Sequence, residues 1–339
     1  MNSLFQNALN RVAQKTPPVW MMRQAGRYHQ HYQGIRVKHS FEEMCKNPEL
    51  ATEVAMGPIQ DFDFDVAILF SDLLFILEGL GMGLQYTDKG PQLGFSLTKE
   101  TFSKLHSAEQ AIDFMKFQKT ACELTRKALP KNKSLIGFVG GPWTLYAYAV
   151  EGHHSGGLMK AKQNLGIWND FMKLLLPTLI GNIEWQLQGG AEVVMIFDTA
   201  AGEVSPYLFQ ELISPVLIQL AQRFPGKLGY YSKATQACYF TPAFLQAPWV
   251  GMGFDHHWDL RQCFSLRGNG FVQGNFDQYL LHLETSEFRS LLESYLSKMK
   301  NLSPEQRQGW VCGLGHGVLP KTPEKHVKYF VDRVREVFI

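Results

Sequence analysis

Three arginines near the N-terminus suggest the first chemistry for this chain. Arg23 and Arg27 are four residues apart, so a helical turn would direct both guanidinium groups to one side, and Arg36 follows nearby. Planar, permanently charged guanidinium groups bind carboxylates and phosphates, so the cluster favours a ligand with several acidic groups. Alternatively, the arginines form surface ion pairs with Glu42 and Glu43.

Acidic, hydroxyl and imidazole side chains follow three apolar runs further along the chain. Asp72 and the pair Asp198-Thr199 each come directly after such a run, and either can bind a ligand or cap the next helix. His316 lies between Gly315 and Gly317, which allow close backbone approach and leave the imidazole ring uncovered. A carboxylate such as Asp72 is therefore a candidate hydrogen-bond acceptor or acid.

The spacing of the histidines does not favour a catalytic metal, and we expect none. His29-Gln30-His31 resembles the H-x-H motif of metal-dependent barrel hydrolases, but it lies a full loop beyond the first apolar run. The adjacent pairs His153-His154 and His256-His257 would point to opposite sides of an extended chain. No phosphate-binding G-x-x-x-x-G-K-[ST] motif occurs, and Gly313–Gly317 resembles a dinucleotide motif only superficially.

These candidate residues follow short, continuous apolar runs, which are typical of strands buried on both faces. The eight runs are Val19–Met22, Val66–Phe70, Leu135–Val139, Val193–Phe197, Leu228–Tyr231, Trp249–Met252, Gly270–Val272 and Trp310–Leu314. Helical periodicity is found at 42–62, 108–128, 166–187, 206–224, 236–245, 260–266 and 277–298, and in a last helix with Thr322 as its cap and Pro323 at its first position.

This alternation predicts an α/β fold, a single (β/α)₈ barrel over residues 1–339. In such barrels the active site lies at the C-terminal ends of the strands, which is where the candidate residues occur.

Composition excludes several classes of protein. The 339 residues carry 33 Lys plus Arg against 31 Asp plus Glu, a net charge of 33 − 31 = +2, which argues against nucleic-acid binding. With 45% hydrophobic residues the chain is not of the disordered class. Five scattered cysteines fit reduced thiols, and neither a secretory signal nor a membrane span is predicted, so we expect a cytoplasmic protein.

Two long motifs and three shorter blocks give the chain a resemblance to the uroporphyrinogen decarboxylase family. The long motifs are Pro18–Tyr28 and Gly137–Leu145 with its continuation Tyr148–Gly152. The shorter blocks are Phe70–Leu74, Ile196–Glu203 and Leu314–Pro320. The matches run in order over almost the whole chain, and long motifs of this kind are specific.

The resemblance implies a cofactor-free barrel enzyme, usually a homodimer, that removes carbon dioxide from the four acetate arms of uroporphyrinogen and leaves the methyl groups of coproporphyrinogen. It also implies roles for matching residues. Asp72 and Arg23 would be catalytic, and Asp72 would accept hydrogen bonds from the pyrrole N–H groups. The implied substrate-binding residues are Arg23, Gln24, Ala25, Arg27, Arg36, Asp72, Tyr148, Phe197, Thr199 and His316.

Some positions differ from the family pattern. The family usually has Pro-Glu where His29-Gln30 stands, proline at Leu77, serine at Thr199 and Asp-Trp where Asp255 is followed by His256-His257.

Two rival functions stay open. A corrinoid-dependent methyltransferase of the same superfamily would need a zinc-binding His-x-Cys pair, which this sequence lacks. A non-catalytic tetrapyrrole-binding protein would need only the arginines.

Overall fold

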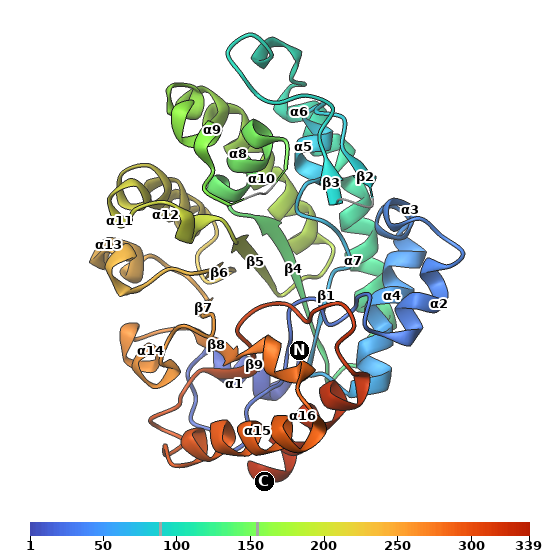
Figure 1. Cartoon of the computed structure of the whole chain (residues 1–339), viewed down its shortest axis with the longest axis vertical. Helices are drawn as coiled ribbons and strands as arrows, with labels where there is room; N and C mark the ends of the chain where they lie inside the picture. The colour runs from blue at the N-terminus through green and yellow to red at the C-terminus, as the bar shows by residue number, and fades with distance from the viewer. Residues whose placement is uncertain (88–89, 154–155) are drawn as a thin grey trace.

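The computed structural model describes residues 1–87, 90–153 and 156–339 and contains a curled, seven-stranded parallel sheet (Figure 1). Neighbouring strands follow chain order, and each pair is joined by helices on the outer face of the sheet. The strands are β1 (Val66–Ile68), β4 (Ser134–Gly140), β5 (Val193–Asp198), β6 (Leu228–Ser232), β7 (Gly251–Gly253), β8 (Phe271–Phe276) and β9 (Trp310–Leu314). The α/β prediction and seven of the eight predicted strands are confirmed.

The predicted first strand, Val19–Met22, is not a strand: it makes one isolated parallel bridge, between Val19 and Cys312. Cys312 exchanges backbone hydrogen bonds with Pro18 (2.9 Å) and Trp20 (3.0 Å) on one side of this segment. On the other side the Val19 carbonyl accepts the Asp65 N–H at 3.1 Å, but the Val19 N–H bonds to the Asp65 carboxylate at 2.8 Å, where a ladder would supply a backbone carbonyl. A side chain therefore replaces the backbone partner and ends the ladder.

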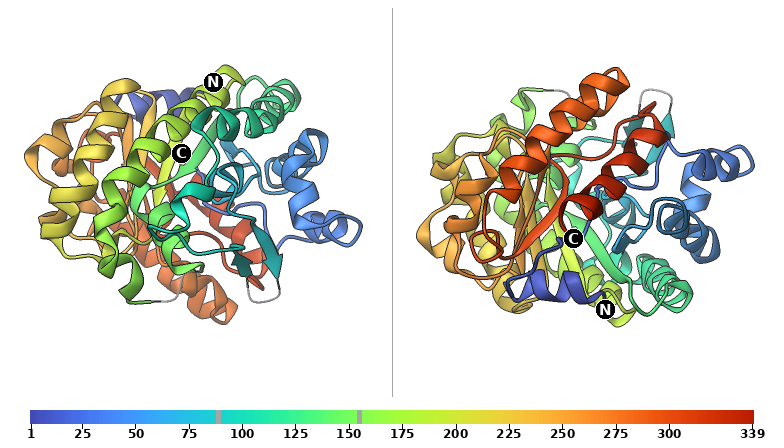
Figure 2. Two further views of the ribbon diagram at one scale, coloured as in Figure 1. Left: turned by 90° about the horizontal axis from the view of Figure 1, so that it is seen from above. Right: turned by 90° about the horizontal axis from the view of Figure 1, so that it is seen from below.

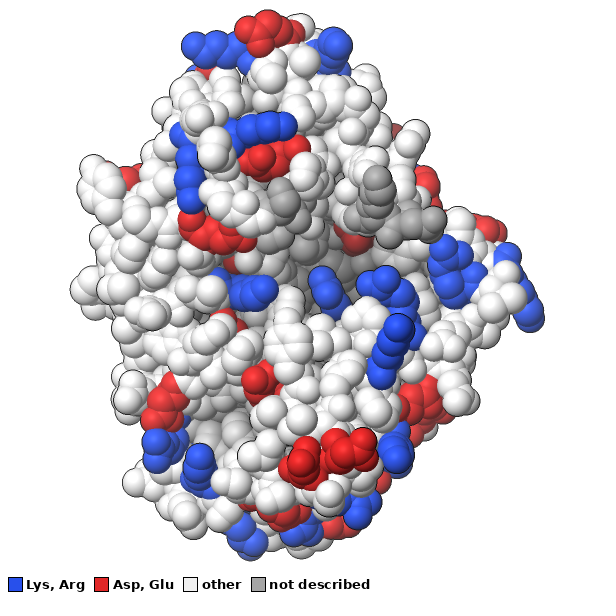
Figure 3. Space-filling model, in the orientation of Figure 1, with Lys and Arg blue, Asp and Glu red and all other residues white. Residues whose placement is uncertain are grey.

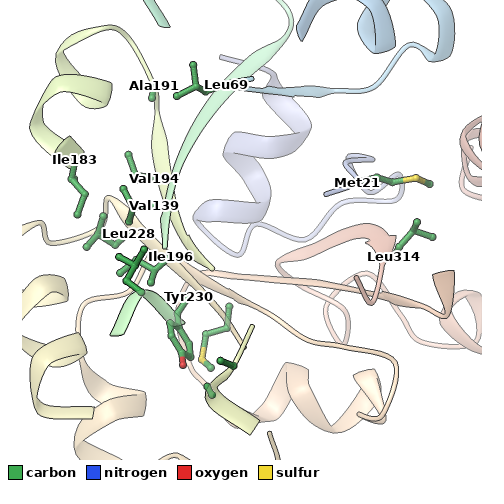
Figure 4. Packing of buried hydrophobic residues seen from close by; sticks show 14 of the residues in the cluster. Met21, Leu69, Val139, Ile183, Ala191, Val194, Ile196, Leu228, Tyr230 and Leu314 are labelled. Carbon is green, nitrogen blue, oxygen red and sulfur yellow. The ribbon is translucent and has the colours of Figure 1, made fainter. Parts of the chain in front are cut away.

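Two apolar clusters hold the sheet in place. The inner cluster contains side chains from the first and last strands together, among them Val66, Met195, Phe271 and Val311, which requires the sheet to curl. Phe5 of α1 (Ser3–Leu9) belongs to this cluster and lies 6.1 Å from the Phe271 ring. Alternate residues face outward, and Figure 4 shows Val139, Val194, Ile196 and Leu228 grouped with Ile183 of a covering helix.

The helices form the outer layer, as both views in Figure 2 show. They are α2 (Gln30–Arg36), α3 (Phe41–Lys46), α4 (Pro48–Phe62), α5 (Phe75–Gly79), α6 (Ala108–Phe114), α7 (Lys116–Ala128), α8 (Pro142–Glu151), α9 (Met159–Gln163), α10 (Trp168–Gln188), α11 (Pro206–Leu208), α12 (Ser214–Arg223), α13 (Pro242–Gln246), α14 (Leu260–Leu266), α15 (Thr285–Lys300) and α16 (Glu324–Val337). Strands β2 (Gln85–Thr87) and β3 (Gly90–Gln92) pair as a separate antiparallel sheet. No helix in the described ranges is long and apolar enough to cross a membrane.

Several helix predictions need correction. The helix predicted at 108–128 is two helices, α6 and α7, and α13 and α15 begin later than the starts predicted in 236–245 and 277–298. The helix predicted at 42–62 is divided into α3 and α4, because the Asn47 side chain accepts the N–H groups of Glu49 and Leu50 and starts a new helix at Pro48. The predicted cap of the last helix is also wrong. Pro323 itself is the N-cap of α16, while the Thr322 hydroxyl bonds to His282 at 3.0 Å.

Candidate active site

Asp72 lies in the loop between β1 and α5 and is partly buried. One carboxylate oxygen, Oδ1, accepts the Leu74 N–H at 2.8 Å, just before α5 begins. Burial raises the pKa of the Asp72 carboxyl above its usual range. The hydrogen bond from Leu74, the Tyr86 hydroxyl and the Arg23 charge each lower this pKa, so all three groups lie near the carboxylate. Asp72 thus orders the helix start while Oδ2 remains available for a ligand.

Arg23 is exposed in the loop that follows the Val19 segment, and its backbone has a positive φ of 56°. This left-handed conformation is uncommon for a non-glycine residue and occurs often at functional sites. The side chain passes over Gly317, where an added Cβ would lie only 2.5 Å from the Arg23 Cδ. A larger residue at position 317 would therefore clash with the Arg23 side chain in this position. The contact places Arg23 against the loop that carries His316.

Tyr148 on α8 joins this group. Burial raises the pKa of its hydroxyl, the Asp72 charge raises it further, and Arg23 lowers it. Since charges act strongly over short distances in a partly buried site, Tyr148 lies close to both residues. The structure thus brings together three residues that are far apart in the sequence.

His316 follows β9 and is fixed by Tyr231 of β6. The Tyr231 hydroxyl lies 2.8 Å from the Gly315 carbonyl and 3.1 Å from His316 Nδ1, and the two rings stack at 6.0 Å. The hydroxyl has one hydrogen and the carbonyl can only accept, so Nδ1 donates to the Tyr231 oxygen. His316 Nε2 is then left as an acceptor.

A pH effect on stability follows from the position of His316. Burial lowers its pKa to about 3, and the charges of Arg23 and Lys233 contribute. An unfolded chain takes up this proton near the usual value of 6.5, so the imidazole destabilises the fold progressively as pH falls from 6.5 toward 3. We expect the free energy of unfolding to fall less steeply over this range in His316→Gln, measured by urea denaturation. If the free energy of unfolding fell equally with pH in both proteins, the lowered pKa of His316 would be contradicted.

Asp198 has a structural role and does not face a ligand. It is fully buried, and its Oδ1 accepts the Thr144 hydroxyl at 2.6 Å and the Thr144 N–H at 3.0 Å. Burial raises the pKa of Asp198 to about 6, although the bonds from Thr144 oppose the increase. The Thr144 hydroxyl in turn accepts the Ala200 N–H at 3.0 Å. This contact fixes the start of α8, which carries Tyr148, against the end of β5.

Replacing Thr144 with valine should therefore destabilise the protein. Valine keeps the shape but leaves the buried Asp198 carboxylate with fewer donors, at a cost of about 1–3 kcal/mol. Thermal unfolding would detect the loss as a lower midpoint. An unchanged midpoint would show that the contact does not stabilise the helix start.

Phe197 and Thr199 lie on either side of Asp198 at the end of β5. Phe197 is buried in the inner cluster, 5.6 Å from the Phe138 ring and 6.1 Å from the Tyr231 ring. Thr199 is partly exposed. Because side chains alternate along a strand, Phe197 and Thr199 share the inner side while Asp198 points outward.

The three arginines do not form the ion pairs with Glu42 and Glu43 that were the alternative explanation. In the described part of the chain Glu42 pairs with Lys46, and Glu43 pairs with His39. Arg27 and Arg36 are exposed, and Arg36 donates to the His39 carbonyl at 2.9 Å. Figure 3 shows a row of basic side chains along one edge of a central hollow.

Gln24 and Ala25 occupy the turn between the first two arginines. Gln24 is buried and donates to the Val66 carbonyl at 3.1 Å, while its Oε1 has no hydrogen-bond partner in the part of the chain that the structure describes. Ala25 is partly buried. The Gln24 side chain therefore ties the arginine loop to β1, next to the Asp72 loop.

The chain matches the family model "Uroporphyrinogen decarboxylase" over residues 1–337. The uroporphyrinogen decarboxylase of Schizosaccharomyces pombe is 31% identical, with 99% of this chain and 97% of the relative covered. That of Orientia tsutsugamushi is 33% identical, with 99% and 98% covered. The chain belongs to the uroporphyrinogen decarboxylase family. A methyltransferase structure from Methanosarcina mazei matches with a TM-score of 0.72 over the full length of both chains, but at 15% identity it shows the fold alone.

Three of the departures from the family pattern make contacts within the fold in this member of the uroporphyrinogen decarboxylase family. His29 is buried, with Nε2 at 2.7 Å from Asp61, and Leu77 is fully buried in α5. His257 bonds back to the buried Asp255 at 3.2 Å. Within the described residues, no three His, Cys, Asp or Glu side chains are grouped so as to hold a metal ion. His154 lies outside the described residues.

One site residue was missed in this family member. Tyr86, on the β2–β3 hairpin, lies beside Asp72 although the sequence offered no motif there. The signal that could have found it is the short run Leu84–Thr87 before Gly90, which is typical of a hairpin strand.

Proposed function

We propose that this chain removes carbon dioxide from the acetate arms of uroporphyrinogen and releases coproporphyrinogen. The observation that carries the proposal is the grouping of Asp72, in the loop after β1, with Arg23 and with Tyr148 of α8. A partly buried carboxylate with the Arg23 guanidinium near it suits a substrate that carries both N–H donors and several carboxylates.

The chemistry needs an electron sink and not a cofactor. A pyrrole protonated at its α-carbon is an iminium-like cation, and it accepts the electron pair that the departing carbon dioxide leaves behind. Ionised Asp72 stabilises this cation electrostatically while it accepts the pyrrole N–H groups. Because the four N–H groups converge on one acceptor, the macrocycle is held as a dome over Asp72.

The arginines and the remaining wall residues orient the substrate. Arg23, Arg27 and Arg36 bind carboxylate arms, and Arg23 also lowers the pKa of Asp72 so that more of it is ionised. Tyr148, Thr199 and neutral His316 supply polar contacts, and Phe197 packs against the macrocycle. Gln24 and Ala25 hold the loop that carries Arg23 and Arg27 in place beside β1. A chain of net charge +2 can bind an octacarboxylate because the local placement of Arg23, Arg27 and Arg36, and not the total charge, sets the field that the substrate meets.

The rival functions have less support. The family model and the curated relatives named above are uroporphyrinogen decarboxylases. A zinc-dependent methyltransferase needs a cluster of His and Cys side chains that bind the zinc ion. Residues 1–87, 90–153 and 156–339 contain no group of three side chains of His, Cys, Asp or Glu that could do so. A passive tetrapyrrole binder needs the arginines but not a buried acceptor such as Asp72.

Three broader features belong to the same proposal. Residues 1–339 form one barrel domain that the Val19 segment closes, supported by its backbone bonds to Cys312 and by Trp20 and Met22 in the inner cluster. The enzyme is a homodimer, which size-exclusion chromatography with light scattering would test. It acts in the cytoplasm, in keeping with five free cysteines.

Anaerobic incubation with uroporphyrinogen tests the proposed activity. Chromatography of the oxidised products counts their carboxyl groups, and a decarboxylase lowers the count stepwise from eight to four. A methyltransferase or a passive binder leaves all eight in place, and that result would refute the proposal.

A further inference from the structure

Tyr86 is held firmly beneath the candidate site. Its ring makes edge contacts with Phe41 of α3, at 4.8 Å, and with Phe75 of α5, at 6.1 Å. Its strand, β2, pairs with β3 so that Tyr86 lies opposite Pro91. The ring therefore packs against two aromatic neighbours, while its backbone is held by the strand pairing.

The Tyr86 hydroxyl is buried and, among the described residues, has no hydrogen-bond partner within ordinary geometry. A buried hydroxyl without a partner costs about 1–3 kcal/mol, so such groups are rare unless a partner arrives with a ligand or a small rearrangement. The neighbouring polar group is the Asp72 carboxylate, and each of the two affects the other's pKa through a side-chain hydrogen-bonding contact.

The Asp72 carboxylate has room for a second donor. In the described residues, the Leu74 N–H on Oδ1 is the one hydrogen bond of ordinary geometry that it accepts. An ionised carboxylate has about four acceptor sites, so Oδ2 can take both a phenol and substrate N–H groups.

We propose that Tyr86 is a positioning residue for Asp72, its hydroxyl donating to Oδ2 and fixing the carboxylate in the orientation that meets the substrate. Asp72 is then held from both oxygens, by the Leu74 amide on one side and by Tyr86 on the other. The importance of this bond for turnover rests on the proposed function, but the bond itself does not.

The ionisable groups around Asp72 allow a clean test by pH. Within residues 1–87, 90–153 and 156–339 they are Arg23 of the arginine loop, Cys45 of α3, Tyr86 of β2 and Tyr148 of α8. Burial raises the pKa of the Cys45 thiol and of both tyrosines, so these groups stay neutral where Asp72 titrates. A change in the acid limb of the rate profile therefore reports on Asp72.

The test compares Tyr86→Phe with wild type and with Tyr207→Phe, a matched control on α11 whose tyrosine is 72% exposed. Phenylalanine keeps the ring contacts and removes one donor to the carboxylate, so the pKa of Asp72 rises. We expect the acid limb of kcat/KM to move to higher pH by about one unit, with the plateau rate within a few-fold of wild type. The control should keep the wild-type profile.

A second readout does not depend on turnover. The infrared C=O band of protonated Asp72, identified by its loss in Asp72→Asn, should titrate at higher pH in Tyr86→Phe than in wild type. An unmoved band, or a rate that falls equally at every pH, would overturn the positioning role. If wild type has no decarboxylase activity but the band still moves, the proposed function fails and the Tyr86 contact stands.

Discussion

Asp72→Asn is expected to lower kcat by about a hundred- to a thousandfold, the usual effect of removing a preorganised electrostatic partner of the transition state. Asparagine keeps the size of the side chain and its carbonyl can still accept the Leu74 N–H, so the loop keeps its shape. It carries no negative charge, and the protonated pyrrole loses its counter-ion. KM should stay within a few-fold, because the arginines still bind the carboxylate arms.

Steady-state kinetics under nitrogen would measure both constants. Asp113→Asn is a suitable control, since Asp113 is 70% exposed on α6 and pairs with Lys116. Near-normal turnover in Asp72→Asn would remove Asp72 from the mechanism. A rise in KM with unchanged kcat would make it a binding residue only.

Arg23→Ala is expected to lower kcat/KM by a similar factor of about a hundred or more, for two reasons. It removes a guanidinium that binds a substrate carboxylate, a charge-assisted contact worth about 1.5–3 kcal/mol. It also removes a cation that lowers the pKa of Asp72, so less of the carboxylate is ionised and activity should begin to fall at higher pH than in wild type.

The fold should survive this change, because Arg23 is exposed. Circular dichroism and thermal unfolding would check this, and Arg261→Ala, at an exposed arginine paired with Asp259, is the matched control. Arg23→Lys should recover little of the activity, since an ammonium group cannot make a forked contact. Full activity in folded Arg23→Ala would refute the catalytic role of Arg23.

The sequence predicted the sheet well because strands buried on both faces leave a strong signal in continuous apolar runs. β5 and β9 lie almost where their runs do. The failure at Val19 has a local cause, since the Asp65 side chain takes the N–H that a ladder would use. No pattern in the segment itself could show a partner that lies so far along the chain.

The sequence was a poorer guide to the candidate site than to the sheet. Asp72 and Asp198 look alike in sequence, each following an apolar run, and only packing separates them. Thr144 on a neighbouring helix donates two hydrogen bonds to Asp198, whereas Asp72, in the described residues, accepts one bond of ordinary geometry, on Oδ1. Tyr86 was missed because a hairpin outside the main sheet carries it, and its approach to Asp72 is a tertiary contact.

Incubation of the wild-type protein with uroporphyrinogen in deuterated water under nitrogen, without added metal or cofactor, tests the central claim most directly. Each carbon dioxide that leaves must be replaced by one hydrogen from solvent, so mass spectrometry and NMR should show coproporphyrinogen with one deuterium in each of its four new methyl groups. Uroporphyrinogen that is recovered intact with all eight carboxyl groups, although it binds to the protein, would contradict the account.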